Sequence, residues 1–212
     1  MPSCPLCKME NASSFFQDKE RDYFRCGRCH LVFVPPRFFL SPDEEKARYD
    51  LHQNSPEDAE YRRFLSRLFK PLTSRLAPGS RGLDFGSGPG PTLSVMFREI
   101  GHTVNIYDYF YAKDASVLNE RYDFITATEV LEHLREPENE LNRLWDGLKP
   151  GGSLGIMTKL VRDAEAFSRW HYKDDPTHVC FFSRPTLEWI AVQWRANICF
   201  VAKDAILFHK QD

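Results

Sequence analysis

The stretch that decides the fold is residues 81–101, RGLDFGSGPGPTLSVMFREIG. A short apolar segment ends at Asp84, and glycines follow at alternate positions, Gly86, Gly88 and Gly90, ahead of a helical pattern. Glycines allow positive φ angles and let a ligand approach the backbone closely. A strand, a glycine loop and a helix in this order are typical of a nucleotide-like cofactor site at the carboxyl end of the first strand of an α/β sheet.

The segments that follow alternate between strand and helix. The stretch 102–109, HTVNIYDY, predicts a second strand that ends in Asp108, where a carboxylate can accept hydrogen bonds from both hydroxyls of a ribose. This alternation predicts a doubly wound α/β sheet with mostly parallel strands. The further expected elements are strand 122–128, helix 137–148, strand 153–158, helix 186–194 and strands 198–202 and 205–210.

The segment TEVLEHL, residues 128–134, begins where a predicted strand ends, so it lies at the carboxyl edge of the sheet. If this segment is helical, Glu129, Glu132 and His133 occupy positions i, i+3 and i+4 and share one face. Two carboxylates and an imidazole on one face are suitable ligands for a divalent cation. His178, in a later loop at the same edge, is a fourth candidate ligand.

The same residues also allow interpretations without a metal. His178 or His133 can act as a general base, since imidazole titrates near neutral pH. Glu129 can face the cofactor instead, and His133 can be a structural histidine that packs or hydrogen-bonds locally. The nearby aromatic residues Trp170 and Tyr172 fit either a lid over the active-site mouth or a buried core.

Four of the cysteines form two CxxC pairs, which the segment 8–25 separates: Cys4, Cys7, Cys26 and Cys29. Two such pairs can turn four thiolates toward one point, which suits a closed structural zinc site; free or redox-active cysteines are the alternative. Strands are expected at 13–17 and 22–25, with a third at 31–34. So short a segment needs the metal for stability. Cys180 and Cys199 stand alone and are expected in the core.

Two helices are expected between the cysteine-rich segment and the glycine loop. Ser41 and Ser55 have the pattern of N-caps, and each is followed by proline at the first helical position. The second helix carries an apolar stripe from Tyr61 to Leu76. We expect this stripe to pack on the following domain, and a surface for a partner is the alternative.

The charge balance gives no sign of a strongly basic surface. The chain has 28 Lys and Arg against 30 Asp and Glu, a formal net charge of −2, which favours a small-molecule substrate over RNA. A local RNA-binding face on the cysteine-rich segment is the alternative to a merely solvated face. Its candidate residues are Lys19, Arg21, Arg25, Arg28, Arg37, Phe24, Phe33 and Phe38.

The chain carries no pattern of a secretory signal and no run of about 18 apolar residues that predicts a transmembrane helix. Cysteine pairs in such a chain are typical of a reducing compartment. We therefore expect a cytoplasmic protein without membrane contact.

Residues from about 80 to 212 resemble the class I S-adenosylmethionine-dependent methyltransferases. The resemblance rests on LDFGSGPG, IYDY, YDFITATEVLEHL, LKPGGSLGIMT and HVCFFSRPTLEWIA. It implies a Rossmann-like sheet whose glycine loop passes under the methionine part of the cofactor. Asp84 would support the loop and the amino group, Asp108 would hold the ribose, Tyr109 would lie near the adenine, and Thr128 would also contact the cofactor.

The Glu-x-x-Glu-His set resembles that of small-RNA 3′-terminal 2′-O-methyltransferases, which have a later histidine, and that of ubiquinone-pathway O-methyltransferases. By this resemblance Glu129, Glu132, His133 and His178 would hold a divalent cation that lowers the pKa of a substrate hydroxyl. Many methyltransferases without a known metal carry a similar segment, so the metal-free interpretations stay open.

The chain departs from the family pattern after Asp108. The segment that separates it from the next strand, 109–121, is too short for a helix, a strand and a second helix. We expect the edge strand after Asp108 to be very short or missing. The acidic residue that often contacts the adenine from that strand is then in question, and Asp114 is a candidate substitute.

A dehydrogenase is the alternative class for a glycine loop followed by an acidic residue. Dinucleotide phosphates bind amide groups at a helix N-terminus. Pro89 and Pro91 remove two such donors, whereas S-adenosylmethionine has no phosphate and does not need them.

The sequence thus predicts a zinc ribbon at residues 1–36, a helical connector at 37–78 and a methyltransferase domain at 79–212. The expected reaction is in-line methyl transfer to an O, N or C nucleophile of a small molecule. One alternative is an RNA methyltransferase that uses the ribbon to bind RNA. Another is a non-catalytic module whose ribbon recruits a protein partner. The whole chain also resembles a group of bacterial methyltransferase-like proteins, which indicates no substrate.

Overall fold

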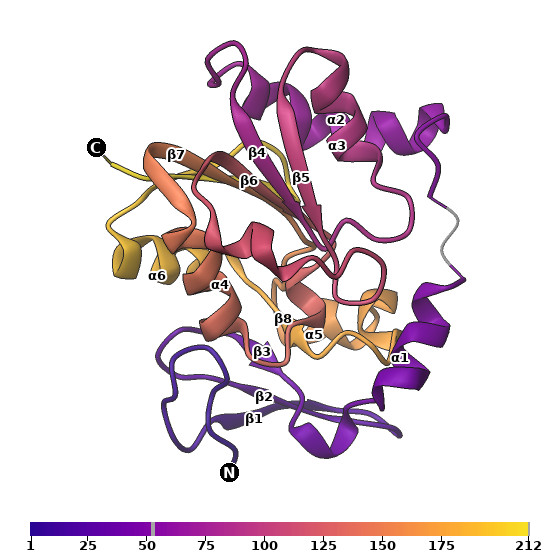
Figure 1. The fold of residues 1–212 in the computed structure, drawn as a ribbon. Coiled ribbons are helices and arrows are strands. Elements are labelled where there is room, and N and C mark those ends of the chain that lie inside the picture. Colours follow the sequence, from indigo (N-terminus) through magenta and orange to yellow (C-terminus); the bar gives the residue numbers. More distant parts are fainter. Residues whose placement is uncertain (52–53, 212) are drawn as a thin grey trace.

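The computed structural model describes residues 1–51 and 54–211. The central strands are β4 (Arg81–Phe85), β5 (Thr103–Tyr107), β6 (Tyr122–Thr128), β7 (Leu148–Met157), β9 (Asn197–Phe200) and β10 (Ala205–His209). They form one sheet in the order β5-β4-β6-β7-β10-β9 (Figure 1). Neighbours from β5 to β7 are parallel, whereas β10 is antiparallel to both β7 and β9.

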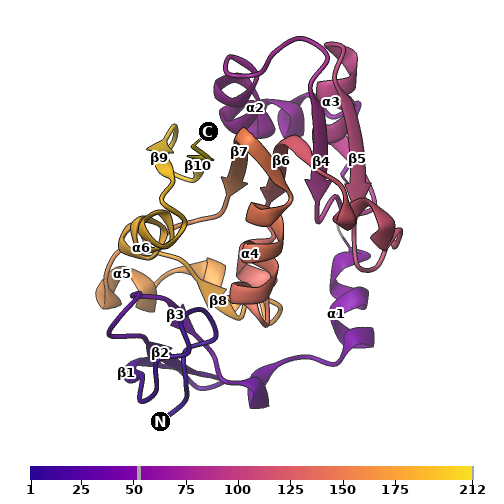
Figure 2. The ribbon, with the colours of Figure 1, turned by 60° about the vertical axis from the view of Figure 1, so that its left-hand side comes forward.

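Helices cover both faces of this sheet, which confirms the predicted doubly wound α/β fold (Figure 2). The larger ones are α2 (Ala59–Thr73), α3 (Thr92–Glu99), α4 (Pro137–Asp146) and α6 (Arg184–Trp194). Neighbouring residues of β6 point to opposite faces of the sheet. Phe124 packs in the hydrophobic core beneath α2 and α3, and Ile125 packs in the core beneath α4 and α6. None of the described helices is long and apolar enough to cross a membrane.

The expected shortening after Asp108 is confirmed within the described residues. Strand β5 is the edge of the sheet, and the segment 109–121 contains only the short 3-10 helix η2 (Ala115–Asn119). Elsewhere the predicted elements are present, although β7 begins at Leu148 rather than at position 153. The sheet therefore ends at β5.

The cysteine-rich segment forms the predicted hairpin. Its strands β1 (Ser13–Gln17), β2 (Asp22–Arg25) and β3 (Val32–Phe33) are joined by β8 (Cys180–Phe181) in a four-stranded sheet, β1-β2-β3-β8. Strand β8 comes from the loop region after β7, so the N-terminal segment shares a sheet with a part of the chain that is remote from it in sequence. We call residues 1–36 the ribbon.

The connector contains α1 (Pro42–Tyr49) and α2, with the short 3-10 helix η1 (Pro36–Phe38) before them. The Ser41 cap is confirmed, since Ser41 and Glu44 form a capping box. The Ser55 cap is wrong: the Asp58 carboxylate accepts the Glu60 and Tyr61 amides instead, so α2 begins later. Along α2, Leu65, Leu68 and Leu72 are buried, as expected for packing on the sheet. The remaining short helices are α5 (Ala164–Ser168) and η4 (His171–Asp174).

Candidate active site

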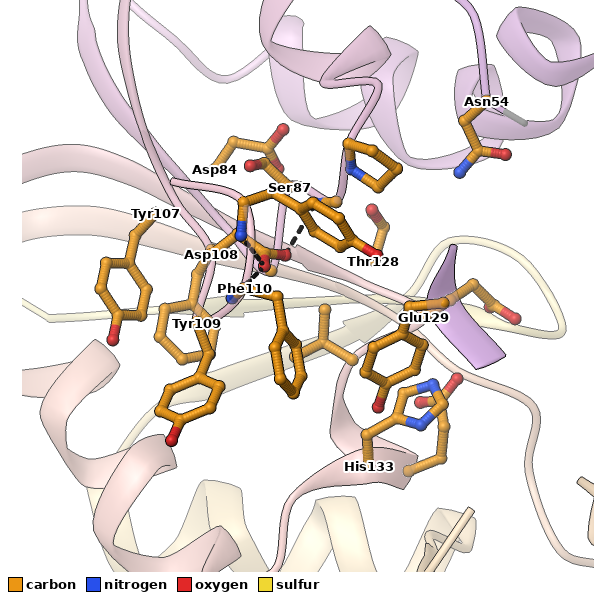
Figure 3. A pocket seen from close by; sticks show the side chains of 18 of the residues that line it. Asn54, Asp84, Ser87, Tyr107, Asp108, Tyr109, Phe110, Thr128, Glu129 and His133 are labelled. Atoms are coloured by element: carbon orange, nitrogen blue, oxygen red, sulfur yellow. Dashed lines mark hydrogen bonds between the residues drawn. The ribbon is translucent and has the colours of Figure 1, made fainter. Parts of the chain in front are cut away.

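A cavity of about 800 Å³ lies at the carboxyl ends of β4, β5 and β6 (Figure 3). The glycine loop and Asp108 line one part of it, and Glu132, His133 and His178 line another. The connector supplies a further wall. The candidate cofactor loop and the candidate metal ligands therefore face one common space.

The conformation of the glycine loop explains its composition. Gly86 and Gly88 have φ angles of +70° and +62°, which favour glycine. A Cβ atom at Gly86 would collide with the side chain of Val130, and one at Gly90 would collide with the backbone carbonyl of Asn54. The loop thus leaves its backbone open to a ligand and lets the connector approach closely.

Asp84 lies buried beneath the loop. Its Oδ1 accepts a hydrogen bond of 2.8 Å from the Thr126 hydroxyl. Burial raises the pKa of Asp84 to about 6. This placement suits the expected role of supporting the loop.

Asp108 is fixed by three backbone amides. Its Oδ2 accepts from Gly88 at 2.8 Å, and its Oδ1 accepts from Phe110 and Tyr111 at 2.8 and 3.0 Å. The carboxylate therefore ties the glycine loop to the turn after β5. Tyr109 lines the cavity but is 65% exposed.

The suggested role of Asp114 in adenine binding is not supported. Among the described residues, Asp114 is not part of the cavity lining, and its carboxylate accepts the Ser116 amide at 3.0 Å as the N-cap of η2. The short segment after β5 turns this side chain toward its own helix.

The helical conformation that was considered for residues 128–134 does not form. Glu129 has a φ angle of +53°, and its amide donates to the Met157 carbonyl at 2.8 Å, so the chain leaves β6 without entering a helix. Only η3 (Leu131–His133) makes a single 3-10 turn. Glu129 therefore does not share a face with Glu132, and its side chain extends away from the His133 ring (Figure 3).

Glu129 and Thr128 line the cavity together with Ser87. Within the described part of the chain, Glu129 Oε1 and Ser87 Oγ are buried atoms without a hydrogen-bond partner. Burial, and then the nearby Glu132 carboxylate, raise the pKa of Glu129 to about 8. A cationic or polar ligand would satisfy these atoms.

Glu132, His133 and His178 do come together, with one ligand atom of each within 4.8 Å of the others. Glu132 is 1% exposed, and burial raises the pKa of its carboxyl. The Thr158 hydroxyl donates to its Oε2 at 3.0 Å, and the Tyr172 hydroxyl donates to its Oε1. Three of the four predicted ligands therefore form one group, and Glu129 lies outside it.

Backbone carbonyls orient both imidazoles. His133 Nδ1 lies 3.2 Å from the Thr177 carbonyl, and His178 Nδ1 lies 2.6 Å from the Tyr172 carbonyl. Because a carbonyl can only accept, we assign the proton to Nδ1 and the lone pair to Nε2. Burial, and then His133, lower the pKa of His178, which favours its neutral form. Neutral imidazoles held in this way suit either metal binding or general base catalysis.

The aromatic residues near His178 belong to the core. Trp170 packs against Phe167 and Tyr172, with ring centroids 5.8 and 4.9 Å apart, and neither Trp170 nor Tyr172 lines the cavity. This arrangement favours the core interpretation over the lid. Tyr172 acts on the site only through its contacts with Glu132 and His178.

Sequence reasoning missed the contribution of the connector. Tyr49, Asn54, Tyr61 and Phe64 line the cavity, and the Asn54 amide donates to the Tyr61 hydroxyl at 3.3 Å. Burial raises the pKa of Tyr61 to about 12. The available signal was Tyr61, whose hydroxyl makes it the one polar side chain of the apolar stripe, but the pattern does not say which cavity this side chain faces.

The four ribbon cysteines also form one group, with their sulfurs within 4.8 Å of one another. The Cys4–Cys29 and Cys7–Cys26 sulfur distances are 3.5 and 3.4 Å. Disulfide sulfurs would be about 2.05 Å apart, whereas Zn–S bonds of about 2.3 Å place tetrahedral sulfurs about 3.8 Å apart. The group therefore fits a tetrahedral metal site.

The two lone cysteines differ in their surroundings. Cys180 is buried, as expected. Cys199 is exposed on the edge strand β9, so the prediction that it lies in the core is wrong. Apolar neighbours in sequence do not bury a side chain that points outward from an edge strand.

The parallel strands, the glycine loop and the shared cavity define a class I methyltransferase fold. Residues 54–197 match the model of a family described as a methyltransferase domain, and the chain belongs to this family. Ubiquinone biosynthesis O-methyltransferases of Pseudomonas savastanoi and Pseudomonas syringae are each 31% identical over 87 residues, 41% of this chain. The chain spans only 37% of the length of these relatives.

Solved structures share the fold. The 1,6-didemethyltoxoflavin N1-methyltransferase of Burkholderia thailandensis, solved with its substrate and S-adenosylhomocysteine, superimposes with a TM-score of 0.53 at 17% identity. That match covers 95% of this chain and all of the other. A methyltransferase-like protein of Bacillus halodurans gives a TM-score of 0.52 at 16% identity, over 64% of this chain and 67% of the other.

Proposed function

We propose that the cavity binds S-adenosylmethionine and that the protein transfers its methyl group to a small molecule, most readily to a hydroxyl oxygen. The observation that carries this proposal is that the glycine loop and the group Glu132, His133 and His178 line the same cavity. A methyl donor and a group that activates a nucleophile would then lie side by side. Such a reaction depends chiefly on positioning.

The chemistry of the cavity suits a cationic cofactor. S-adenosylmethionine supplies an electrophilic methyl group on a positively charged sulfonium, and it also carries an ammonium group. The raised pKa values of Glu129 and Asp84 mean that a nearby cation would stabilise their ionised forms. The glycine loop and Asp108 would hold the rest of the cofactor, with Tyr109 and Thr128 beside it.

The trio Glu132, His133 and His178 would hold a divalent cation, with Tyr172 and Thr158 fixing the carboxylate that binds it. A bound divalent cation lowers the pKa of a coordinated hydroxyl and orients it for attack. In a metal-free reaction, Nε2 of His178 would accept the hydroxyl proton directly. In both cases an ionised Glu132 would stabilise positive charge on the metal ion or on the neighbouring imidazole. Glu129 would face the cofactor and would not be a ligand.

We further propose that Cys4, Cys7, Cys26 and Cys29 bind a structural zinc ion. The support is the grouping of their sulfurs, together with backbone amides of Arg28 and Cys29 that point to Cys26 Sγ at 3.3 and 3.5 Å. Four thiolates close the coordination shell, so this ion would have no catalytic position.

RNA as a substrate has weaker support. Of the residues considered for an RNA-binding face, Arg21 and Phe33 are buried, with exposures of 8% and 2%. Arg37 is paired with Asp22. The ribbon therefore presents fewer free cationic and aromatic groups than its sequence suggests.

Exchange of Asp108 for asparagine tests the cofactor site. The amide nitrogen would replace an oxygen that accepts from Gly88 or from the following turn, and the lost charge-assisted hydrogen bond is worth about 1.5–3 kcal/mol. We expect the affinity for S-adenosylhomocysteine, measured by calorimetry, to fall about 10- to 100-fold. Asp114→Asn is the matched control, because that carboxylate lies outside the cavity lining, and its affinity should change less than about twofold.

Equal affinities of Asp108→Asn and Asp114→Asn for S-adenosylhomocysteine would contradict the proposed role of Asp108 in cofactor binding. Absence of any S-adenosylhomocysteine binding by the unaltered protein would favour the alternative of a non-catalytic module.

A second test addresses the acceptor. We expect methyl label from S-adenosylmethionine, added with an extract of the source cells, to enter the small-molecule fraction. Label that ribonuclease releases would instead favour the RNA alternative, and label in protein would contradict both. A heat-inactivated sample provides the background.

A further inference from the structure

Arg21 is a buried arginine in the ribbon hairpin. Its guanidinium donates to backbone carbonyls of the loop that carries His178. The Nη1 group donates to His178 at 2.9 Å and Pro176 at 3.4 Å, and the Nη2 group donates to Lys173 and to Asp175 at 3.0 Å. One ribbon side chain therefore satisfies four carbonyls of the short segment 173–178.

Arginine suits this position because its planar fork offers five N–H donors in fixed directions. The fork is itself held in place: Nε donates to the Tyr23 hydroxyl at 3.1 Å, and that hydroxyl donates to Asp18 Oδ2 at 3.1 Å. The Asp18 carboxylate also accepts the Arg21 amide at 2.8 Å. The guanidinium is thus a rigid part of the ribbon and not a flexible surface group.

The ribbon holds the same loop at its far end. The Val34 amide donates to the Val179 carbonyl at 3.0 Å, and Val32 and Phe33 pair with Phe181 and Cys180. Lys173, at the start of the loop, lies 3.5 Å from the Asp18 carboxylate. Residues 173–181 are therefore bonded to the ribbon both before and after His178.

We infer that Arg21 is a positioning residue for His178, through which the ribbon holds the third member of the Glu132, His133 and His178 group in place. This inference rests on the proposed function of that group. It gives the ribbon a role in the active site that needs neither RNA nor a protein partner. Arg21 touches no substrate or cofactor itself.

The test compares Arg21→Gln and Arg21→Lys with the unaltered protein, all with zinc retained. We expect amide hydrogen exchange over residues 171–181 to become about 10- to 100-fold faster in Arg21→Gln, because four carbonyls lose the hydrogen bonds that Arg21 donates. Mn²⁺, which prefers oxygen and nitrogen ligands over thiolates, probes the trio by electron paramagnetic resonance. Its affinity should fall about 10- to 100-fold, as for other residues that orient metal ligands.

Lysine should rescue both properties in part, since an ammonium keeps the charge but offers only three donors. The affinity for S-adenosylhomocysteine should stay within about threefold, because Arg21 lies outside the cavity lining, to which the glycine loop and Asp108 belong. Arg63→Gln is the matched control: Arg63 is an exposed arginine of α2 outside the cavity lining, and its replacement should change none of these readouts.

Unchanged hydrogen exchange over residues 171–181 in Arg21→Gln would overturn the inference. If that variant fails to fold, as loss of S-adenosylhomocysteine binding would reveal, unchanged exchange in Arg21→Lys would overturn it. If the unaltered protein does not bind Mn²⁺, the proposed metal site fails, whereas hydrogen exchange still decides the role of Arg21.

Discussion

Replacement of Glu132 by glutamine should lower methyl transfer by at least about 100-fold, a loss within the range found for residues that activate a nucleophile. Glutamine has the same shape but no charge, so it removes an anionic ligand and the negative partner of the two imidazoles. The Thr158 and Tyr172 hydroxyls can each donate or accept, so both hydrogen bonds to the side chain can persist. The defect should therefore be chemical and not structural.

Incorporation of methyl label into the acceptor fraction measures this loss. Affinity for S-adenosylhomocysteine and the melting temperature should be maintained. The melting temperature can even rise, because burial raises the pKa of Glu132 and its ionised form costs stability near neutral pH. Glu165→Gln, on exposed α5, makes the same chemical change away from the cavity and should leave transfer unchanged. Full activity of Glu132→Gln would exclude both the metal and the charge-based role.

Replacement of Cys29 by serine should release zinc and inactivate the enzyme together. Cys29 is fully buried among the four sulfurs. Structural zinc sites contribute about 10–16 kcal/mol to the folding of comparably small metal-binding modules. Loss of one thiolate should therefore unfold the ribbon and free the loop that it holds around His178. We expect zinc content near zero and methyl transfer reduced by at least about 100-fold.

Binding of S-adenosylhomocysteine distinguishes this effect from general unfolding. It should persist in Cys29→Ser, because the glycine loop and Asp108 directly follow strands β4 and β5, which belong to a different sheet from the ribbon strands. Cys199→Ser is the matched control, since Cys199 is exposed and outside the cysteine group, and it should keep both zinc and activity. Retention of activity without zinc would contradict the link between the ribbon and the active site.

Local sequence determined most of the secondary structure. The hairpin strands at 13–17 and 22–25 and the strand at 122–128 have the boundaries that their apolar patterns predict. The glycine loop and the missing edge strand after Asp108 also followed from the sequence, because both depend on residue type and chain length over short distances. The cysteine spacing likewise predicted that four sulfurs would meet.

Local sequence patterns predicted the wrong structure where two backbone conformations were both compatible with the local sequence. At the second helix, Asp58 displaced Ser55 as the cap, since its carboxylate reaches two amides. At Glu129, helical spacing suggested a shared face with Glu132. Instead, the Glu129 amide donates to the Met157 carbonyl of β7, and Glu129 has a left-handed backbone conformation, so its side chain points away from the His133 ring (Figure 3).

Only the tertiary structure decided how the ribbon and the connector join the active site. The hydrogen bond from Arg21 to the His178 carbonyl links two parts of the chain that are remote in sequence. Sequence periodicity reports which side chains are buried, but not which distant backbone they meet, because that depends on how whole elements dock. For the same reason the sequence supplied the residues of the candidate site, whereas the backbone at the end of β6 separated Glu129 from the group and the packing of the ribbon against β8 placed His178 within it.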